Sequence, residues 1–266
     1  MRKILAGIVL GAIMGTAAAA EGGLRPLMTA DDSRGFEAVG RIDLGQNSFC
    51  TGTLVAENLV LTAAHCLFEP ETFARRDLSE MEFLAGWRDG RALAYRGVRR
   101  VFVHPAYVFE GNREGVARVV NDIALLELDR PIRGNGIHPV GTGAKPRKGD
   151  PVSVVSYAIN REERPSLERA CDVLARPADM LVISCTVDFG ASGAPILTFA
   201  EGTPRVVSVV SAKAQSSGRP VSLGVDIEGP LETLMEMARG DPAAPRPLPV
   251  VRASGSAGGS AKFLRP

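Results

Sequence analysis

The feature that most constrains the fold is a series of short apolar segments separated by Gly, Pro, Asn and Asp, running from Phe36 to Ile227. Short strands at roughly 8–12-residue spacing indicate a barrel or sandwich rather than an alternating α/β sheet. The expected strands are Thr53–Val55, Asn58–Leu61, Arg99–Val103, Ile123–Leu128, Val152–Tyr157, Met180–Ser184, Pro195–Phe199, Arg205–Ser211 and Ser222–Ile227.

One helix is expected, late in the chain. Pro230 suits the first turn of this helix, and Gly240 suits the position where it ends. Its apolar residues recur at i, i+3, i+4 and i+7 and are Leu231, Leu234, Met235 and Ala238.

The composition divides the chain into parts. Residues 141–150 (GTGAKPRKGD) predict a linker between a first half, 36–140, and a second half, 151–240. In residues 241–266, 16 of 26 are Pro, Ala, Gly or Ser, which predicts a disordered tail. Residues 21–35 are poor in core residues and are expected to be an N-terminal arm or a pro-segment.

The N-terminus predicts export. Arg2 and Lys3 precede an uncharged stretch, Ile4 to Ala20, that ends in small residues. This pattern is typical of a secretory signal peptide over residues 1–20. The alternative is a retained membrane anchor, but no charged stop-transfer cluster follows the stretch. We therefore expect a periplasmic or secreted protein without stable membrane insertion after cleavage.

The charge balance bears on partners. Lys and Arg number 31 against 30 Asp and Glu, a net charge of +1. This balance gives no electrostatic case for nucleic acid or an anionic membrane as partner.

Four cysteines follow the predicted signal: Cys50, Cys66, Cys171 and Cys185. An even number in an exported chain suggests disulfides, and four cysteines allow three pairings. Pairing by proximity joins Cys50 to Cys66 and Cys171 to Cys185. A zinc site is disfavoured because the chain has no Cys-x-x-Cys pair and no clustered histidines, so no metal or cofactor is expected.

Three residues are candidates for chemistry, and each has a structural alternative. His65, in LTAAHC, is either a general base or a buried histidine bonded to a backbone carbonyl. Asp122, in NDIALL, either orients an imidazole or accepts backbone N–H bonds at a strand start. Ser192, in FGASGAP, is either a nucleophile beside oxyanion-binding amides of Gly190 and Ser192 or part of a plain hairpin turn.

Together, TAAHC, NDIALL and GASGAP, in the order His, Asp, Ser, resemble the chymotrypsin/trypsin-like serine peptidase family, and more narrowly its bacterial exported branch. The resemblance extends from Phe36 to Gly240 and includes the FCTGTLV and HPAY segments, where His104 is expected to be structural. His138 lies in no motif. An α/β-hydrolase fold is rejected for two reasons: its catalytic residues occur in the order Ser, Asp or Glu, His, and its Gly-x-Ser-x-Gly motif needs a glycine where this chain has Ala194.

The resemblance implies an all-β chain of two six-stranded antiparallel barrels with a C-terminal helix and an active site between the barrels. His65 and Asp122 would come from the first barrel and Ser192 from the second. The amides of Gly190 and Ser192 would bind the oxyanion. The expected substrate is a protein or peptide, and the protein is expected to be a monomer. A Cys50–Cys66 bridge beside the histidine also fits the family.

One departure concerns activation. Ala191 stands where the family commonly has an aspartate that pairs with a newly cut N-terminal amine, and no Ile-Val-Gly-Gly start occurs near residues 35–40. We expect an enzyme that needs no such switch. The alternative is a catalytically weak or inactive peptidase-like binding protein, and an esterase is a third possibility.

The specificity pocket is expected from alignment on Ser192. Its floor would lie near Thr186 and Val187, and its walls near Ser211, Ala212, Lys213 and Gly224. Because Thr186 cannot pair with a basic side chain, trypsin-like cleavage is not expected. Lys213 would narrow the pocket, favour acidic groups, pair with Asp188 or point to solvent.

Overall fold

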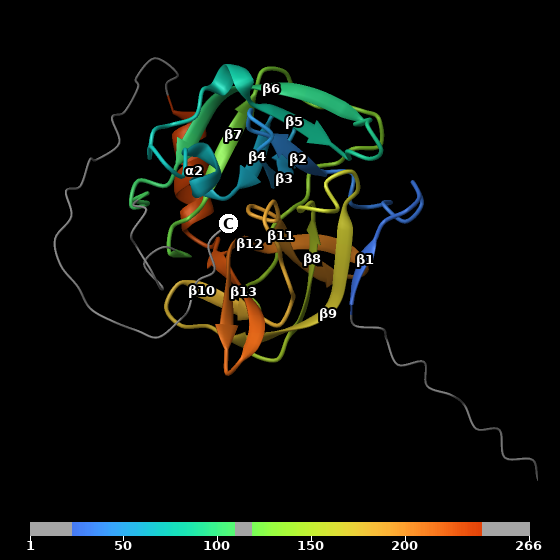
Figure 1. The fold of residues 1–266 in the computed structure, drawn as a ribbon, viewed down its shortest axis with the longest axis vertical. Coiled ribbons are helices and arrows are strands. Elements are labelled where there is room, and N and C mark those ends of the chain that lie inside the picture. Colours follow the sequence, from blue (N-terminus) through green and yellow to red (C-terminus); the bar gives the residue numbers. More distant parts are fainter. Residues whose placement is uncertain (1–22, 110–118, 241–266) are drawn as a thin grey trace, which may run out of the picture.

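The computed structural model describes residues 23–109 and 119–240 and shows two antiparallel β-barrels packed against each other (Figure 1). The predicted signal peptide, residues 1–20, and the predicted tail, residues 241–266, lie outside the described residues. Within the described ranges, no helix is long and apolar enough to cross a membrane.

The first barrel closes in the order β2-β3-β4-β7-β6-β5. Every residue of β7 is buried, which explains its nearly continuous apolar sequence. The exception, Glu127, forms ion pairs with Arg99 and Arg100. The strands are β2 (Val39–Asp43), β3 (Phe49–Ala56), β4 (Leu59–Thr62), β5 (Glu82–Ala85), β6 (Ala94–Val103) and β7 (Ala124–Leu128).

The second barrel closes in the order β8-β9-β10-β13-β12-β11, since β11 and β9 both pair with β8. A seventh strand, β1, pairs with β9 outside this ring. The strands are β1 (Leu24–Pro26), β8 (Pro151–Ser156), β9 (Ser166–Ala175), β10 (Met180–Ile183), β11 (Pro195–Ala200), β12 (Thr203–Ser216) and β13 (Arg219–Asp226).

The predicted fold class is confirmed, and the nine expected strands overlap observed ones. Four strands, β1, β2, β5 and β9, were not expected. In β2 a glycine and an arginine interrupt the apolar pattern, although Gly40 packs so closely that a Cβ there would lie 2.4 Å from the Phe83 ring. In β9, charged residues alternate with buried ones, so neighbouring strands rather than hydrophobicity define the element.

The expected helix is confirmed as α2 (Pro230–Arg239), with Pro230 in its first turn. Leu231 and Leu234 are buried, and the helix contacts β6 and β7 (Figure 1). The helix that ends the second half therefore packs on the first barrel.

Residues 21–35, expected as an arm or pro-segment, dock on the second barrel from Leu24 onward. The Leu27 N–H donates to the Pro165 carbonyl over 2.9 Å, and the Leu27 side chain is fully buried. This segment therefore adds to the core, contrary to its apolar-poor composition.

The predicted linker lies along β12. The Gly143 N–H donates to the Val206 carbonyl at 2.9 Å, and the Val206 N–H donates to the Gly141 carbonyl at 3.0 Å. Lys145 forms an ion pair with the buried Asp226. These contacts fasten the linker to the second barrel.

The two barrels meet at the loop that carries Ser192. The Thr51 N–H of β3 donates to the Ser192 carbonyl at 2.8 Å, and the Thr51 hydroxyl donates to the Gly190 carbonyl at 2.9 Å. Gly193 has φ +80°, and a Cβ there would lie 2.1 Å from Thr62 Oγ1 and 2.3 Å from the Thr51 carbonyl oxygen. Both backbone conformation and space require glycine at this position.

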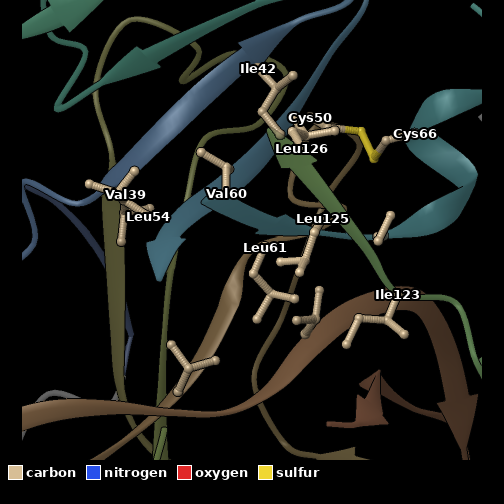
Figure 2. Packing of buried hydrophobic residues seen from close by; sticks show 14 of the residues in the cluster. Val39, Ile42, Cys50, Leu54, Val60, Leu61, Cys66, Ile123, Leu125 and Leu126 are labelled. Carbon is tan, nitrogen blue, oxygen red and sulfur yellow. A yellow bond between two sulfur atoms is a disulfide. The ribbon is translucent and has the colours of Figure 1, made fainter. Parts of the chain in front are cut away.

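Both expected disulfides are confirmed. Cys50 of β3 is bonded to Cys66 in the short turn after β4, and Figure 2 shows this bridge at the edge of the first-barrel core. Cys171 of β9 is bonded to Cys185, two residues after β10. Each bridge ties a barrel strand to a segment next to a candidate site residue.

We predict that Leu27→Ala lowers the free energy of unfolding by about 2–5 kcal/mol, because it empties a fully buried position. The adjacent Met28, which is 55% exposed, provides the control. Met28→Ala is expected to change the free energy of unfolding by less than about 0.5 kcal/mol. Urea denaturation measures both. Equal effects would show that the segment does not dock in solution.

We also predict that Gly193→Ala destabilises the protein by about 1–3 kcal/mol more than Gly202→Ala. Gly202 has nearly the same φ, +79°, but nothing lies within 4 Å of its Cβ position. The control therefore carries the backbone strain without the clash. Denaturant midpoints of the two variants give the difference, and equal midpoints would contradict the observed barrel contact.

Candidate active site

His65 lies in the turn Ala64–Leu67 that follows β4, and Asp122 lies two residues before β7. Because β4 and β7 are paired strands, their ends bring the two residues together. The His65 Nδ1 atom is 2.7 Å from Asp122 Oδ2, and the His65 backbone N–H donates to Asp122 Oδ1 at 2.8 Å. The carboxylate thus holds both the ring and the backbone of the histidine.

Asp122 is 1% exposed, and its third partner comes from the other barrel. The Ser211 hydroxyl of β12 donates to Asp122 Oδ2 at 2.5 Å. A buried carboxylate needs such donors to offset the loss of water. Because an ionised carboxylate can only accept hydrogen bonds, we assign the donor in this contact to His65 Nδ1, an assignment that leaves Nε2 to accept a proton.

Ser192 lies in the loop between Cys185 and β11, seated on Thr51 as described above. The Ala191 N–H donates to the Asp188 carbonyl and the Ala194 N–H to the Ala191 carbonyl, each at 3.0 Å. Gly190 has φ +94°, and a Cβ there would lie 2.3 Å from the Phe49 ring. The loop is therefore fixed by two tight turns and by packing against the first barrel.

The loop leaves two backbone donors unused. Neither the Gly190 nor the Ser192 N–H has an acceptor in the part of the chain that the structure describes. Two such amides on either side of one residue can bind the oxygen of a carbonyl that becomes negatively charged.

A cavity of about 570 Å³ lies between the barrels, and both His65 and Ser192 line it. Phe49 and Cys66 contribute from the first barrel, and Val210 contributes from the second. Within the described residues, no hydrogen bond joins the Ser192 hydroxyl to the His65 ring. The structure thus brings all three candidate residues to one region, with the His65–Asp122 pair formed.

Aromatic side chains form the His65 side of this cavity. Phe68 stacks on Phe109 with ring centroids 4.9 Å apart, and Tyr107 and Phe73 lie against this pair. Phe73 is 47% exposed and has φ +59°, uncommon for a bulky residue. The cavity therefore offers an apolar surface next to the histidine.

The residues expected at the specificity pocket divide into two groups. Val187, Ser211, Ala212 and Lys213 line the cavity, whereas Thr186 and Gly224 do not.

The other contacts of Thr186 and Gly224 explain their positions. The Thr186 N–H donates to Glu168 Oε2 at 2.8 Å, and burial raises the pKa of the Glu168 carboxyl. A Cβ on Gly224 would lie 2.3 Å from Ser208 Oγ and 2.5 Å from Ile196 Cδ1, atoms inside the second barrel.

Lys213 of β12 also lines the cavity. Its Nζ atom lies 3.5 Å from Asp188 Oδ1 and 3.7 Å from the centre of the Phe189 ring. The sequence left four roles open for Lys213, and the structure shows the pairing with Asp188.

Neither the remaining histidines nor two clusters of possible metal ligands, one of which includes His65, provide a metal site among the described residues. His104 accepts the Ala106 N–H at Nδ1, and burial lowers its pKa; His138 is exposed. The side chains of Cys50, His65 and Cys66 lie close together, as do those of Glu168, Cys171 and Cys185. In both clusters the sulfurs are in disulfides and are not available as thiolate ligands.

Sequence reasoning missed several features of the site. It placed Ser211 only as a pocket wall, although Ser211 ends the buried run VVSVVS (206–211) and a buried serine hydroxyl needs an acceptor, which was the available signal. It did not foresee the aromatic side of the cavity, because Phe68 and Phe109 are 41 positions apart in sequence and only the fold stacks them.

Comparisons with known proteins agree with this geometry. The family model described as Trypsin matches residues 28–175, more than half of the chain; the match includes His65 and Asp122 and ends before Ser192. Serine protease 23 of Bos taurus is 30% identical over 167 residues, which cover 55% of this chain and 43% of that protein. Serine protease 23 of Homo sapiens is 30% identical over 168 residues, covering 55% and 42%.

The chain thus spans less than half the length of these curated relatives. A solved structure of a Glu endopeptidase in complex with MPD has a TM-score of 0.67 and covers 83% of this chain and 98% of its own. At 19% identity it shows the shared fold alone. The family match, the two barrels and the His65–Asp122 pair lead to one conclusion: the chain belongs to the trypsin-like serine peptidase family.

Proposed function

We propose that this protein is an exported serine endopeptidase that hydrolyses peptide bonds through His65, Asp122 and Ser192. The observation that carries the proposal is the His65–Asp122 pair, held at 2.7 Å at the edge of a cavity that Ser192 also lines. A general base oriented by a buried carboxylate beside a hydroxyl is the arrangement that nucleophilic catalysis requires.

In the first step the Ser192 Oγ atom attacks the substrate carbonyl carbon while its proton passes to His65 Nε2. The imidazolium that forms is stabilised by Asp122, to which Nδ1 already donates. His65 then gives this proton to the leaving amine, which breaks the peptide bond and leaves an ester on Ser192. Water, deprotonated by the same Nε2, hydrolyses the ester and regenerates the hydroxyl.

The oxygen of the attacked carbonyl gains negative charge in both steps. The free amides of Gly190 and Ser192 are the donors that we assign to it. The loop around them is held by Thr51 and by tight packing at Gly190 and Gly193. Donors fixed before the reaction stabilise the transition state without the cost of reorientation.

Ala191 supports a site that needs no activating N-terminus. Its side chain is fully buried in the apolar core of the second barrel, and its amide bonds to the Asp188 carbonyl. The loop therefore keeps its shape through packing and local hydrogen bonds, without a buried ion pair at this position.

Export rests on the predicted signal peptide and on the two disulfides, which persist in oxidising compartments. The narrower placement in the bacterial exported branch rests on the motif resemblance. A protein or peptide substrate follows from the family.

The alternative is a peptidase-like binding protein without useful turnover. The observation that favours it is the missing hydrogen bond between Ser192 and His65 in the described structure. In unliganded enzymes, however, catalytic hydrogen bonds are often long and tighten when substrate binds.

A fluorophosphonate probe tests the proposal on folded, oxidised protein. We expect labelling of the native protein, none for Ser192→Ala because the nucleophile is gone, and labelling slowed about 100-fold or more for His65→Ala because the general base is lost. The Ser217→Ala variant, at an exposed turn, is the control. Absence of labelling in the native protein over a range of pH would favour the binding protein.

A second prediction concerns the N-terminus. Proteins starting at Glu21, with or without extra residues before it, are expected to label at equal rates, since Ala191 has no side-chain charge with which an N-terminal amine could pair. A protein starting at Phe36 is expected to be less stable because it lacks β1 and Leu27. Activity restricted to one N-terminus would contradict the absence of a switch.

A further inference from the structure

Lys213 lines the same cavity as Ser192, and its contacts have a consequence for substrate choice. Its ammonium reaches from β12 across to Asp188 and Phe189, on the segment that leads into Ser192. β12 itself is tied to the Ser192 loop, since the Gly193 N–H donates to the Val210 carbonyl at 2.8 Å. A substrate side chain that enters here, beside the attacked carbonyl, meets the ammonium.

We propose that Lys213 makes this enzyme selective for substrates with an acidic residue, Glu or Asp, on the acyl side of the cleaved bond. The inference rests on the proposed function and names its substrate class.

The neighbouring residues of the second barrel do not provide a competing preference. Val187 and Val210 are buried and apolar, and Ala212 is small. Thr186, which the alignment placed at the pocket floor, lies outside the cavity lining. Besides His65, the charged residues that line the cavity, among those described, are Glu71, Arg76, Asp188 and Lys213. Arg76 is paired with Glu69, whereas Lys213 and Asp188 lie on the two segments that adjoin Ser192.

Lys213 and Asp188 differ in their exposure to solvent. The Lys213 side chain is 22% exposed, whereas that of Asp188 is 60% exposed. Water therefore screens the negative charge of Asp188 more strongly than the positive charge of Lys213. The electrostatic potential beside this pair is dominated by the ammonium. Their contact at 3.5 Å is long and partly solvated, and such pairs contribute little stability. A substrate carboxylate can therefore replace Asp188 as the partner of Lys213.

The Phe189 ring also keeps the ammonium in place. Its centre lies 3.7 Å from Lys213 Nζ, a cation–π contact that does not neutralise the charge. A basic substrate side chain would meet a like charge at this point, and an apolar one would leave the ammonium without a new partner. Attraction of one class and repulsion of another together produce selectivity.

The test compares peptides that differ only in the acyl-side residue: Glu, Asp, Gln, Leu or Arg. Glu and Gln have nearly the same shape, so their ratio of kcat/KM isolates the charge. We expect the native enzyme to prefer Glu over Gln by about tenfold or more, as a charge-assisted contact predicts, and to cleave the Arg peptide least.

Three variants locate the cause. Lys213→Gln should reduce the Glu/Gln ratio to about one while fluorophosphonate labelling of Ser192 continues. Asp188→Asn removes the competing carboxylate and should raise the ratio. Lys148→Gln, at an exposed lysine outside the cavity lining, is the matched control and should leave it unchanged.

The outcomes separate the two claims. Normal labelling of Ser192 with equal cleavage of the Glu and Gln peptides, or with preferred cleavage after Arg, overturns the role of Lys213 and leaves the peptidase intact. A Glu preference that survives in Lys213→Gln also overturns that role. Failure of labelling in the native protein overturns the proposed function, and the inference with it.

Discussion

The carboxylate of Asp122 is the group on which the rest of the site depends. It accepts hydrogen bonds from the backbone and ring of His65 and from the hydroxyl of Ser211, so donors from both barrels converge on one buried charge. A charge removed from water tolerates few arrangements, because each lost donor leaves it poorly compensated. The same interaction thus orients the histidine and fixes how the second barrel meets the first.

Thr51 has the corresponding role for the nucleophile loop. Its amide and hydroxyl bind the carbonyls of Ser192 and Gly190, and its hydroxyl also accepts the Tyr157 N–H at 3.1 Å. Its carbonyl accepts the Thr62 hydroxyl at 2.9 Å. A fully buried threonine in the first barrel therefore satisfies polar groups of two loops of the second. Gly190 and Gly193 allow the Ser192 loop to approach the first barrel so closely.

Turn residues and strand spacing indicated a barrel or sandwich, and the motif resemblance narrowed this expectation to two six-stranded barrels. The late helix and both disulfides were predicted from helical periodicity and from the proximity of the cysteines in sequence, which are local signals. Strands β2 and β9 escaped prediction, since Gly40 and the charges of β9 are explained only by neighbouring strands. The three motif residues could be named from their order.

The walls of the cavity are a different matter. The positions of Thr186 and Gly224 depend on contacts with Glu168 and with the barrel interior, which alignment on a single serine does not encode. The role of Ser211 toward Asp122 depends likewise on the meeting of two barrels.

The first and last elements that the structure describes, β1 and α2, show how the two halves depend on each other. The strand that precedes the first barrel, β1, extends the sheet of the second, and the helix that follows the second barrel, α2, covers the first. A cut in the connecting segment would thus give two fragments, each lacking an element that the other fragment carries. Each half thus takes part of its packing from an element of the other, so we expect the unfolding of the two halves to be coupled. The two barrels are thus joined by an exchange of terminal elements as well as by the interface that holds the site.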